Sequence, residues 1–192
     1  MKRFRTKGYV PGGWLTNGEV EGLEMANLPP FLRTLLVTDG TVTKSIEAYF
    51  WETVNVENLG QGVMPIDRDL ESLELGQGDE VLQRRVRLVG EDSGAIYAHA
   101  ESLLRLDRLP EELNHELQAG RIGIGELLRE RGLETYRELL GFGVESMGDL
   151  AEVFGGNDAD LLVSRVYRIA LNHHPTILIT EKFPLLLYQD TK

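Results

Sequence analysis

Two stretches of this chain each hold a pair of β-strands joined by a turn too short to contain a helix, and this feature constrains the fold most. The first pair covers residues 82–89 and 95–101, and the second covers residues 162–170 and 176–183. Strands joined by so short a turn run antiparallel, because a parallel pair needs a crossover of a dozen or more residues. We therefore expect an α+β fold built on a single antiparallel β-sheet, with helices flanking it.

Helix-start and helix-end signals predict where those helices lie. Proline opens two of the segments, glycine closes three of them, and a Ser-x-x-Asp pattern precedes the last. The expected helices cover residues 28–36, 110–120, 123–132 and 146–156.

The remaining segments are assigned by apolar pattern and charge. Apolar side chains alternate over residues 46–56, which predicts one more half-buried strand. Residues 57–80 are rich in Gly and acidic side chains and are expected to form an acidic surface loop. Residues 1–20 are expected to form a basic, Gly/Pro-containing N-terminal arm. We expect a single domain over residues 1–192.

The charge of the chain excludes several classes of partner. With 20 Lys+Arg against 31 Asp+Glu, the formal net charge is −11. A nucleic-acid-binding protein needs a basic face against phosphates, and an anionic membrane surface would repel an acidic chain. The longest run without a charged side chain, residues 169–180, is shorter than the ~20 residues that span a bilayer. We therefore expect a cytoplasmic protein whose partners include no nucleic acid and no membrane.

Metal chemistry receives little support from the side chains available. The chain has no cysteine, so thiolate zinc sites are excluded. His173 and His174 fall in the turn between the last two strands, where neighbouring side chains diverge. His99 shares a strand face with Tyr97 and Glu101, and a hydrogen-bonded or exposed histidine is the simpler interpretation. We expect no metal site.

Two charged side chains stand on the apolar face of their strands. Arg84 shares its parity with leucine and valine side chains, and Glu181 shares its parity with isoleucine and phenylalanine. An isolated ion in the interior costs several kcal/mol, so each needs a partner or a pocket. Two interpretations stay open: Arg84 and Glu181 form a buried salt bridge, or both line a cavity where Arg84 binds a ligand carboxylate.

A glycine-rich segment, Gly120-Arg121-Ile122-Gly123-Ile124-Gly125, precedes the helix expected after it. Glycines at a helix start leave backbone N–H groups open to an anion or carboxylate. The segment lacks the G-x-G-x-x-G order of a dinucleotide site, and an ordinary helix-entry turn is the commoner explanation.

Four segments together resemble a known family. They read TDGTVTKSIEAYF, LQRRVRLVGEDSGAIYAHAESLL, GRIGIGELL and SRVYRIALNHHPTILITEKFPLLLY, and they lie within residues 28–188. The combination is similar to the chorismate lyases, also called chorismate pyruvate-lyases. Its strongest element is ITEKFP in the last strand, and the same fold also serves as effector-binding domains of bacterial transcription regulators.

The resemblance implies a fold, a reaction and a site. The helices and the single antiparallel sheet would enclose an internal ligand pocket, and the enzyme would convert chorismate to 4-hydroxybenzoate and pyruvate without a metal or organic cofactor. The family's ligand-binding arginine falls on Arg84, although the adjacent Arg85 is an alternative. Its carboxylate falls on Glu181, and its backbone amide contacts fall on Val42, Ile124 and Gly125.

Two other functions remain open beside this one. The chain could be a non-catalytic effector-binding domain of the same fold, which would bind a small molecule without turnover. It could also be a structural protein in which Arg84 and Glu181 only pair with one another, and the absence of a cavity between sheet and helices would favour that interpretation.

Overall fold

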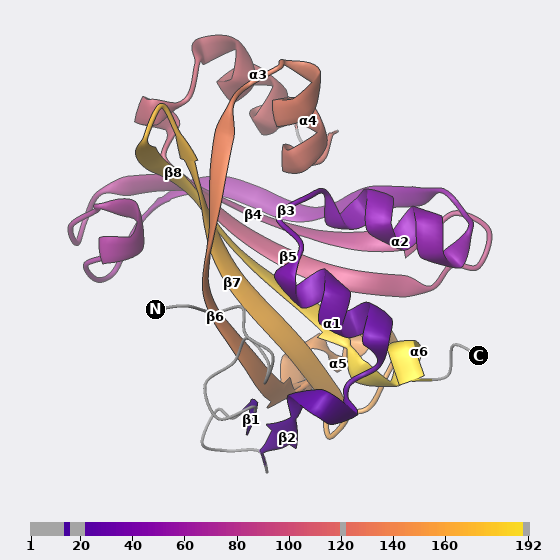
Figure 1. The fold of residues 1–192 in the computed structure, drawn as a ribbon. Helices are drawn as coiled ribbons and strands as arrows, with labels where there is room; N and C mark the ends of the chain where they lie inside the picture. Colours follow the sequence, from indigo (N-terminus) through magenta and orange to yellow (C-terminus); the bar gives the residue numbers. More distant parts are fainter. Residues whose placement is uncertain (1–13, 16–21, 120–121, 190–192) are drawn as a thin grey trace. The chain divides into compact units, whose positions relative to one another are not determined.

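One six-stranded β-sheet organises the protein, in the strand order β3-β4-β5-β8-β7-β6. The computed structural model describes residues 14–15, 22–119 and 122–189. The strands of the sheet are β3 (Val54–Pro65), β4 (Glu80–Gly90), β5 (Ile96–Leu104), β6 (Thr135–Ser146), β7 (Leu161–Leu171) and β8 (His174–Pro184). The strands β3, β4 and β5 pair antiparallel, and both predicted hairpins are present as β4–β5 and β7–β8 (Figure 1). The expected α+β class is confirmed.

Short helices account for most of the remaining structure. The α-helices are α1 (Pro30–Val37), α2 (Val42–Phe50), α3 (Glu111–Ala119), α4 (Ile124–Glu130), α5 (Ala151–Phe154) and α6 (Leu185–Gln189). Single 3₁₀ turns are η2 (Met25–Asn27), η3 (Glu71–Leu73), η4 (Leu106–Arg108) and η5 (Gly148–Leu150), and β1 (Trp14–Leu15) pairs with β2 (Leu23–Glu24). Among the described residues, no helix has the length and apolar character needed to cross a bilayer.

The chain divides into two compact units. The larger unit comprises Asp39–Leu140 and Val166–Glu181, and the smaller one comprises Met1–Thr38, Gly141–Arg165 and Lys182–Lys192. The expectation of a single domain over residues 1–192 stays a prediction. Most of the expected N-terminal arm, residues 1–20, lies outside the described residues.

The segment predicted as a strand over residues 46–56 is wrong in its first half, because Val42–Phe50 form α2. The alternation at Ile46, Ala48 and Phe50 is matched by a second period, in which Val42, Ile46 and Phe50 recur every four residues. The structure follows the helical period, since Val42 and Ile46 are buried and Ala48 is exposed. The helix ends at Trp51, which adopts a left-handed conformation with φ 60°.

Part of the predicted acidic loop over residues 57–80 is also wrong, because β3 continues to Pro65. This strand lies at the edge of the sheet and is largely exposed. Its side chains therefore lack the apolar alternation by which a half-buried strand is recognised. The pairing with β4 shifts register between Asn58 and Gly60, and Gly60 supplies a φ of 145° there.

The strand β6 is a further difference, since no strand was predicted over residues 135–146. It is the other edge of the sheet, and most of its side chains are only partly buried. Two glycines interrupt its pattern, and Gly143 is required by close packing because a Cβ there would lie 2.9 Å from Ser164 Oγ. The short helix α6 was also not predicted.

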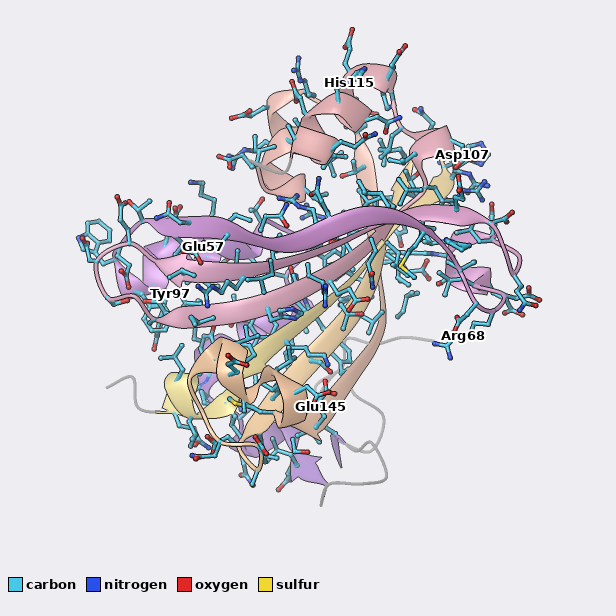
Figure 2. The ribbon with its side chains drawn as sticks, turned by 180° about the vertical axis from the view of Figure 1, so that it is seen from behind. Glu57, Arg68, Tyr97, Asp107, His115 and Glu145 are labelled. Atoms are coloured by element: carbon cyan, nitrogen blue, oxygen red, sulfur yellow. The ribbon has the colours of Figure 1, made fainter. Side chains whose placement is uncertain are left out.

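The helices of the larger unit cover the sheet through apolar side chains. From α3 and α4, Leu113, Leu117, Leu127 and Leu128 join one buried cluster with Ile169, Ile177 and Ile179 of β7 and β8. The outer side of α3 carries exposed residues such as His115 (Figure 2). Helix α2 contacts β3 and lies along it (Figure 1).

Candidate functional site

A cavity of about 420 Å³ opens within the larger unit. Its wall is built from the segment leading into α2, from the start of α4, and from residues of all six strands of the sheet. The volume lies in the range of ~300–1,000 Å³ that is typical of small-molecule sites. The absence of a cavity would have favoured the structural-protein interpretation, and the structure does not provide that support.

All five residues predicted for the site lie in the wall of this one cavity. They are Val42, Arg84, Ile124, Gly125 and Glu181. The parity argument is confirmed for both charged side chains, because Arg84 is 2% exposed and Glu181 is 8% exposed. The roles that the resemblance implies for these residues stay predictions.

Arg84 projects into the cavity from β4, whereas Arg85 is exposed on the opposite face of that strand. Burial lowers the pKa of the Arg84 guanidinium, but an arginine remains charged at neutral pH. The geometry therefore favours Arg84 over Arg85 as the group that meets a ligand.

Glu181 lies on β8 and receives a hydrogen bond from a neighbouring strand. The hydroxyl of Tyr167 on β7 donates to Glu181 Oε1 at 3.1 Å. Both side chains are buried and both line the cavity. Tyr167 therefore orients one oxygen of the Glu181 carboxylate.

Small side chains on β5 create the space between Arg84 and Glu181. In the strand order, β5 separates β4 from β8, and its cavity-facing residues are Ala98, Ala100 and Ser102. Ser102 is the residue opposite Arg84 in the β4–β5 register. A strand with three small inward residues leaves volume that larger ones would fill. The small residues stand at every second position of the sequence. This pattern could have predicted the space, but the expected site rested on charged residues and on the family resemblance.

Two helix starts bring backbone N–H groups to the cavity. Val42 and Ile124 are the first residues of α2 and α4, and neither helix start has a side-chain cap. The first N–H groups of a helix have no intrahelical partner, so those around Val42 and Gly125 are available to an acceptor. Gly120 and Arg121, the beginning of the glycine-rich segment, lie outside the described residues.

Arg137 on β6 also lines the cavity and was not found from the sequence. Its Nη1 donates to the backbone carbonyl of Asp39, just before α2. Its Nη2 lies close to Gly125, where a Cβ would be 3.4 Å away. Arg137 was missed because β6 was not predicted, so no strand face could be assigned to it.

Other charged side chains at the cavity form pairs within a single helix. Lys44 pairs with Glu47 at 2.7 Å on α2, and Arg129 approaches Glu126 at 3.9 Å on α4. No three His, Cys, Asp or Glu side chains of the described chain come together in an arrangement that could hold a metal ion. Of the histidines, His99 is buried outside the cavity wall, and His173 and His174 are exposed.

Sequence comparison matches this chain to one family over most of its length. The family model described as "Chorismate pyruvate-lyase Rv2949c-like" matches residues 36–190. A chorismate pyruvate-lyase of Mycobacterium leprae is 32% identical over 181 residues, covering 92% of this chain and 85% of the relative. A chorismate pyruvate-lyase of Mycobacterium tuberculosis strain H37Rv is 29% identical over 171 residues, covering 87% and 86%.

Structure comparison identifies the same fold in bacterial regulators. The effector domain of PhnF from Mycobacterium smegmatis matches with a TM-score of 0.62 at 14% identity, covering 77% of this chain and 90% of that domain. A GntR-family transcriptional regulator from Bacillus cereus matches with a TM-score of 0.55 at 11% identity, covering 72% and 94%. At these identities the likeness shows the fold alone.

Proposed function

The chain belongs to the Rv2949c-like family of chorismate pyruvate-lyases, and we propose that it converts chorismate to 4-hydroxybenzoate and pyruvate. One observation carries the proposal beyond family membership. A buried arginine and a buried glutamate, Arg84 and Glu181, line a single cavity of suitable volume. This is the minimum that binding an anionic substrate and moving one proton requires.

Arg84 binds the ring carboxylate of chorismate in this proposal. Its guanidinium presents paired N–H donors that match the two oxygens of a carboxylate, and burial strengthens the interaction by excluding water. The N–H groups at the starts of α2 and α4, near Val42, Ile124 and Gly125, supply further donors to the substrate. A protein of net charge −11 thus binds a dianion through a shielded cationic site.

The reaction breaks the C3–O bond of chorismate and removes the hydrogen at C4. The electron pair of the C4–H bond completes the aromatic ring, and the departing enolate takes up a proton to become pyruvate. One proton moves and one C–O bond breaks, so the products balance the substrate with no redox step. Because aromatisation supplies the driving force, orientation contributes more than a strong nucleophile would.

Glu181 is the group placed to act at the C4 end of the ring. It accepts the C4 proton as a base, or accepts a hydrogen bond from the ring hydroxyl and holds the ring in place. Tyr167, through its 3.1 Å hydrogen bond, keeps the carboxylate in one orientation. An enclosed cavity also slows product release, so 4-hydroxybenzoate should inhibit the enzyme.

The decisive experiment follows pyruvate and 4-hydroxybenzoate after addition of chorismate. We expect turnover by the wild-type protein and a loss of about 10²–10⁴-fold in kcat for Glu181→Gln, the usual contribution of a general base. Glu101→Gln is the matched control, because Glu101 stands on β5 with its side chain bonded to Gln83 Nε2 at 2.9 Å, outside the cavity wall. Equal turnover by wild type and Glu181→Gln would exclude the proposed role of Glu181.

Failure of turnover in the wild type would have a different meaning. If chorismate or an aromatic acid raised the thermal midpoint without being converted, the chain would be a non-catalytic binding domain of this fold. That outcome would overturn the lyase proposal while leaving the cavity as a binding site.

A further inference from the structure

Arg137 differs from two other cations of the cavity wall, Lys44 and Arg129, because no carboxylate of the described residues pairs with it. Lys44 and Arg129 each have a glutamate on their own helix. Arg137 instead contacts a backbone carbonyl, that of Asp39. Its positive charge in the cavity wall is therefore not neutralised by the part of the protein that the structure describes.

One nitrogen of the Arg137 guanidinium donates a hydrogen bond, whereas another has no acceptor among the described residues. Nη1 donates to Asp39, while Nε is buried and has no hydrogen-bond partner within the described chain. A buried donor without an acceptor is costly and uncommon in native proteins. A ligand carboxylate would satisfy Nε together with Nη2, because a guanidinium edge matches two carboxylate oxygens.

The strand order places Arg137 and Arg84 on opposite sides of Glu181. Arg84 lies on β4, Glu181 on β8 and Arg137 on β6, with β5 and β7 between them. Four strand spacings of about 4.8 Å separate the two arginine backbones along a flat sheet. Because the two side chains enter the cavity from strands on opposite sides of Glu181, they suit a ligand with an anionic group at each end.

We propose that Arg137 binds the enolpyruvyl carboxylate of chorismate while Arg84 binds the ring carboxylate. The inference rests on the proposed function and deepens it by assigning the second charge of the dianion. The ring then spans the cavity with its C3 and C4 atoms near Glu181, between the two arginines. Gly125 lies beside the Arg137 guanidinium, since a Cβ there would stand 3.4 Å from Nη2.

The test separates the two carboxylates by using the product. 4-Hydroxybenzoate retains the ring carboxylate and lacks the enolpyruvyl one. We expect Arg137→Met to lower kcat/KM for chorismate about 10–100-fold, the effect of losing hydrogen bonds to a charged group. The same variant should change the Kd of 4-hydroxybenzoate less than about twofold, whereas Arg84→Met should weaken the binding of both molecules.

Two further variants make the result specific. Arg137→Lys keeps the charge without the guanidinium fork, and we expect an effect smaller than that of Arg137→Met. Arg168→Met is the control, because Arg168 pairs with Glu138 at 2.8 Å and is not part of the cavity wall. It should leave both constants unchanged. Thermal midpoints of all variants report folding, and Arg137→Gln replaces Arg137→Met if the latter does not fold.

Each outcome decides between this inference and the proposed function. Wild-type turnover with an unaffected Arg137→Met would overturn the inference alone, and so would an equal loss of chorismate and 4-hydroxybenzoate binding. Wild-type binding of chorismate without turnover would overturn the lyase proposal alone, and the Kd values for the two molecules would still test Arg137. Wild-type protein that neither bound nor converted chorismate would overturn both.

Discussion

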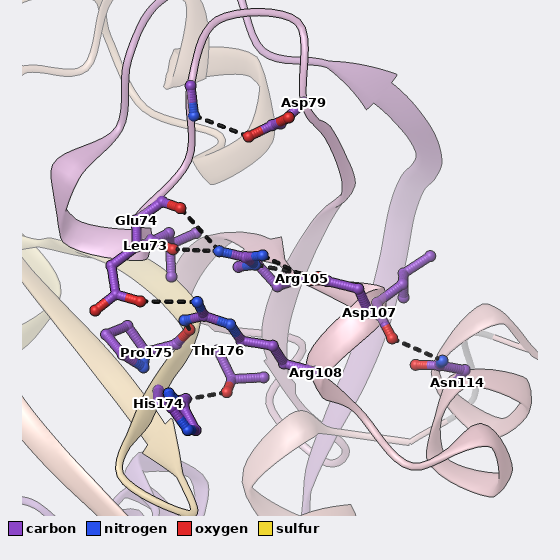
Figure 3. A network of polar contacts seen from close by, with 12 residues as sticks. Leu73, Glu74, Asp79, Arg105, Asp107, Arg108, Asn114, His174, Pro175 and Thr176 are labelled. Atoms are coloured by element: carbon purple, nitrogen blue, oxygen red, sulfur yellow. Dashed lines mark hydrogen bonds and ion pairs between the residues drawn. The ribbon is translucent and has the colours of Figure 1, made fainter.

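Two groups of arginines in the larger unit differ in their surroundings, since one lies in a polar network and the other, Arg84 and Arg137, lines the cavity. One group, Arg105 and Arg108, lies in a network of polar contacts that joins η4 to neighbouring segments (Figure 3). Arg105 donates from Nη1 to the carbonyls of Leu73 and Glu74, at 3.1 and 2.8 Å. Its other nitrogens bind Asp107 at 3.1 and 2.6 Å.

The second arginine of the network is satisfied in the same way. Arg108 donates from Nη1 to the carbonyl of Pro175 and from Nη2 to Glu74 Oε2, both at 2.7 Å. Asn114 adds a bond to the carbonyl of Leu106 at 3.0 Å. Both guanidinium groups donate hydrogen bonds to acceptors that the protein supplies. The network therefore stabilises the η4 turn and leaves little uncompensated positive charge to attract a ligand.

The cavity arginines differ in what surrounds them rather than in their chemistry. Arg84 faces a strand with small side chains, and Arg137 has a buried Nε that no described residue accepts from. The comparison teaches that charge alone does not mark a binding site. An arginine can meet a ligand where the protein leaves space beside it.

Among the variants that test this comparison, the largest expected effect comes from Arg84→Met. Removing the guanidinium should lower kcat/KM for chorismate about 10²–10³-fold, because truncating a buried charged contact costs about 2–5 kcal/mol. The thermal midpoint should stay constant or rise, since burying a methionine costs less than burying an ion. Steady-state kinetics and calorimetry check both. If Arg84→Met were more stable than wild type and still bound chorismate normally, Arg84 would not belong to a ligand-binding group.

Arg105→Met should lower stability and leave activity nearly unchanged, the opposite of what we expect for Arg84→Met. Losing its bonds to two carbonyls and Asp107 should lower the free energy of unfolding by about 1–3 kcal/mol, while kcat/KM changes less than about twofold. Urea denaturation measures the first quantity. Arg68→Met is the control, because Arg68 is an exposed arginine (Figure 2). A loss of activity in Arg105→Met at full stability would show that the network also serves the site.

Tyr167→Phe sharpens the comparison at the cavity itself. It removes one hydrogen bond to Glu181 and leaves both cavity arginines in place. We expect kcat to fall about 3–10-fold, in line with ~0.5–1.5 kcal/mol for one hydrogen bond, and KM to stay unchanged. A raised KM with constant kcat would mean that Tyr167 contacts the substrate instead of orienting Glu181.

The smallest expected effect is on stability and concerns Glu52, a carboxylate whose two oxygens both accept hydrogen bonds from the protein. Hydrogen bonds from the Tyr97 hydroxyl and from the Ser93 backbone and side chain lower the pKa of Glu52 from 4.5 to about 2. A depressed pKa stabilises the folded state above the unfolded value, and this stabilisation is lost as the pH falls from about 4.5 to about 2.

Glu52→Gln tests that pH dependence. The variant should be less stable than wild type at pH 7, and the difference should shrink as the pH approaches 2–3. Urea midpoints at the two pH values measure it, with turnover at pH 7 as the control. A difference between variant and wild type that did not depend on pH would mean that the Glu52 charge contributes nothing.

The strands that were predicted correctly and those that were missed differ in burial. β4 and β8 each bury one face, so their apolar residues alternate and the period can be read locally. β3 and β6 are edge strands with exposed or half-buried side chains, and their sequences carry no such alternation. At α2 both periods were present, and contact with β3 selected the helix.

The sequence by itself determined that Arg84 and Glu181 point inward, because side-chain direction along a strand follows from backbone geometry within a few residues. It also determined the family. Only the tertiary structure decided that β5 alone lies between β4, which carries Arg84, and β8, which carries Glu181. It also decided that Ala98 and Ala100 leave a cavity there and that Arg137 lines the same cavity. Strand order depends on pairing between residues far apart in the chain, which no local pattern encodes.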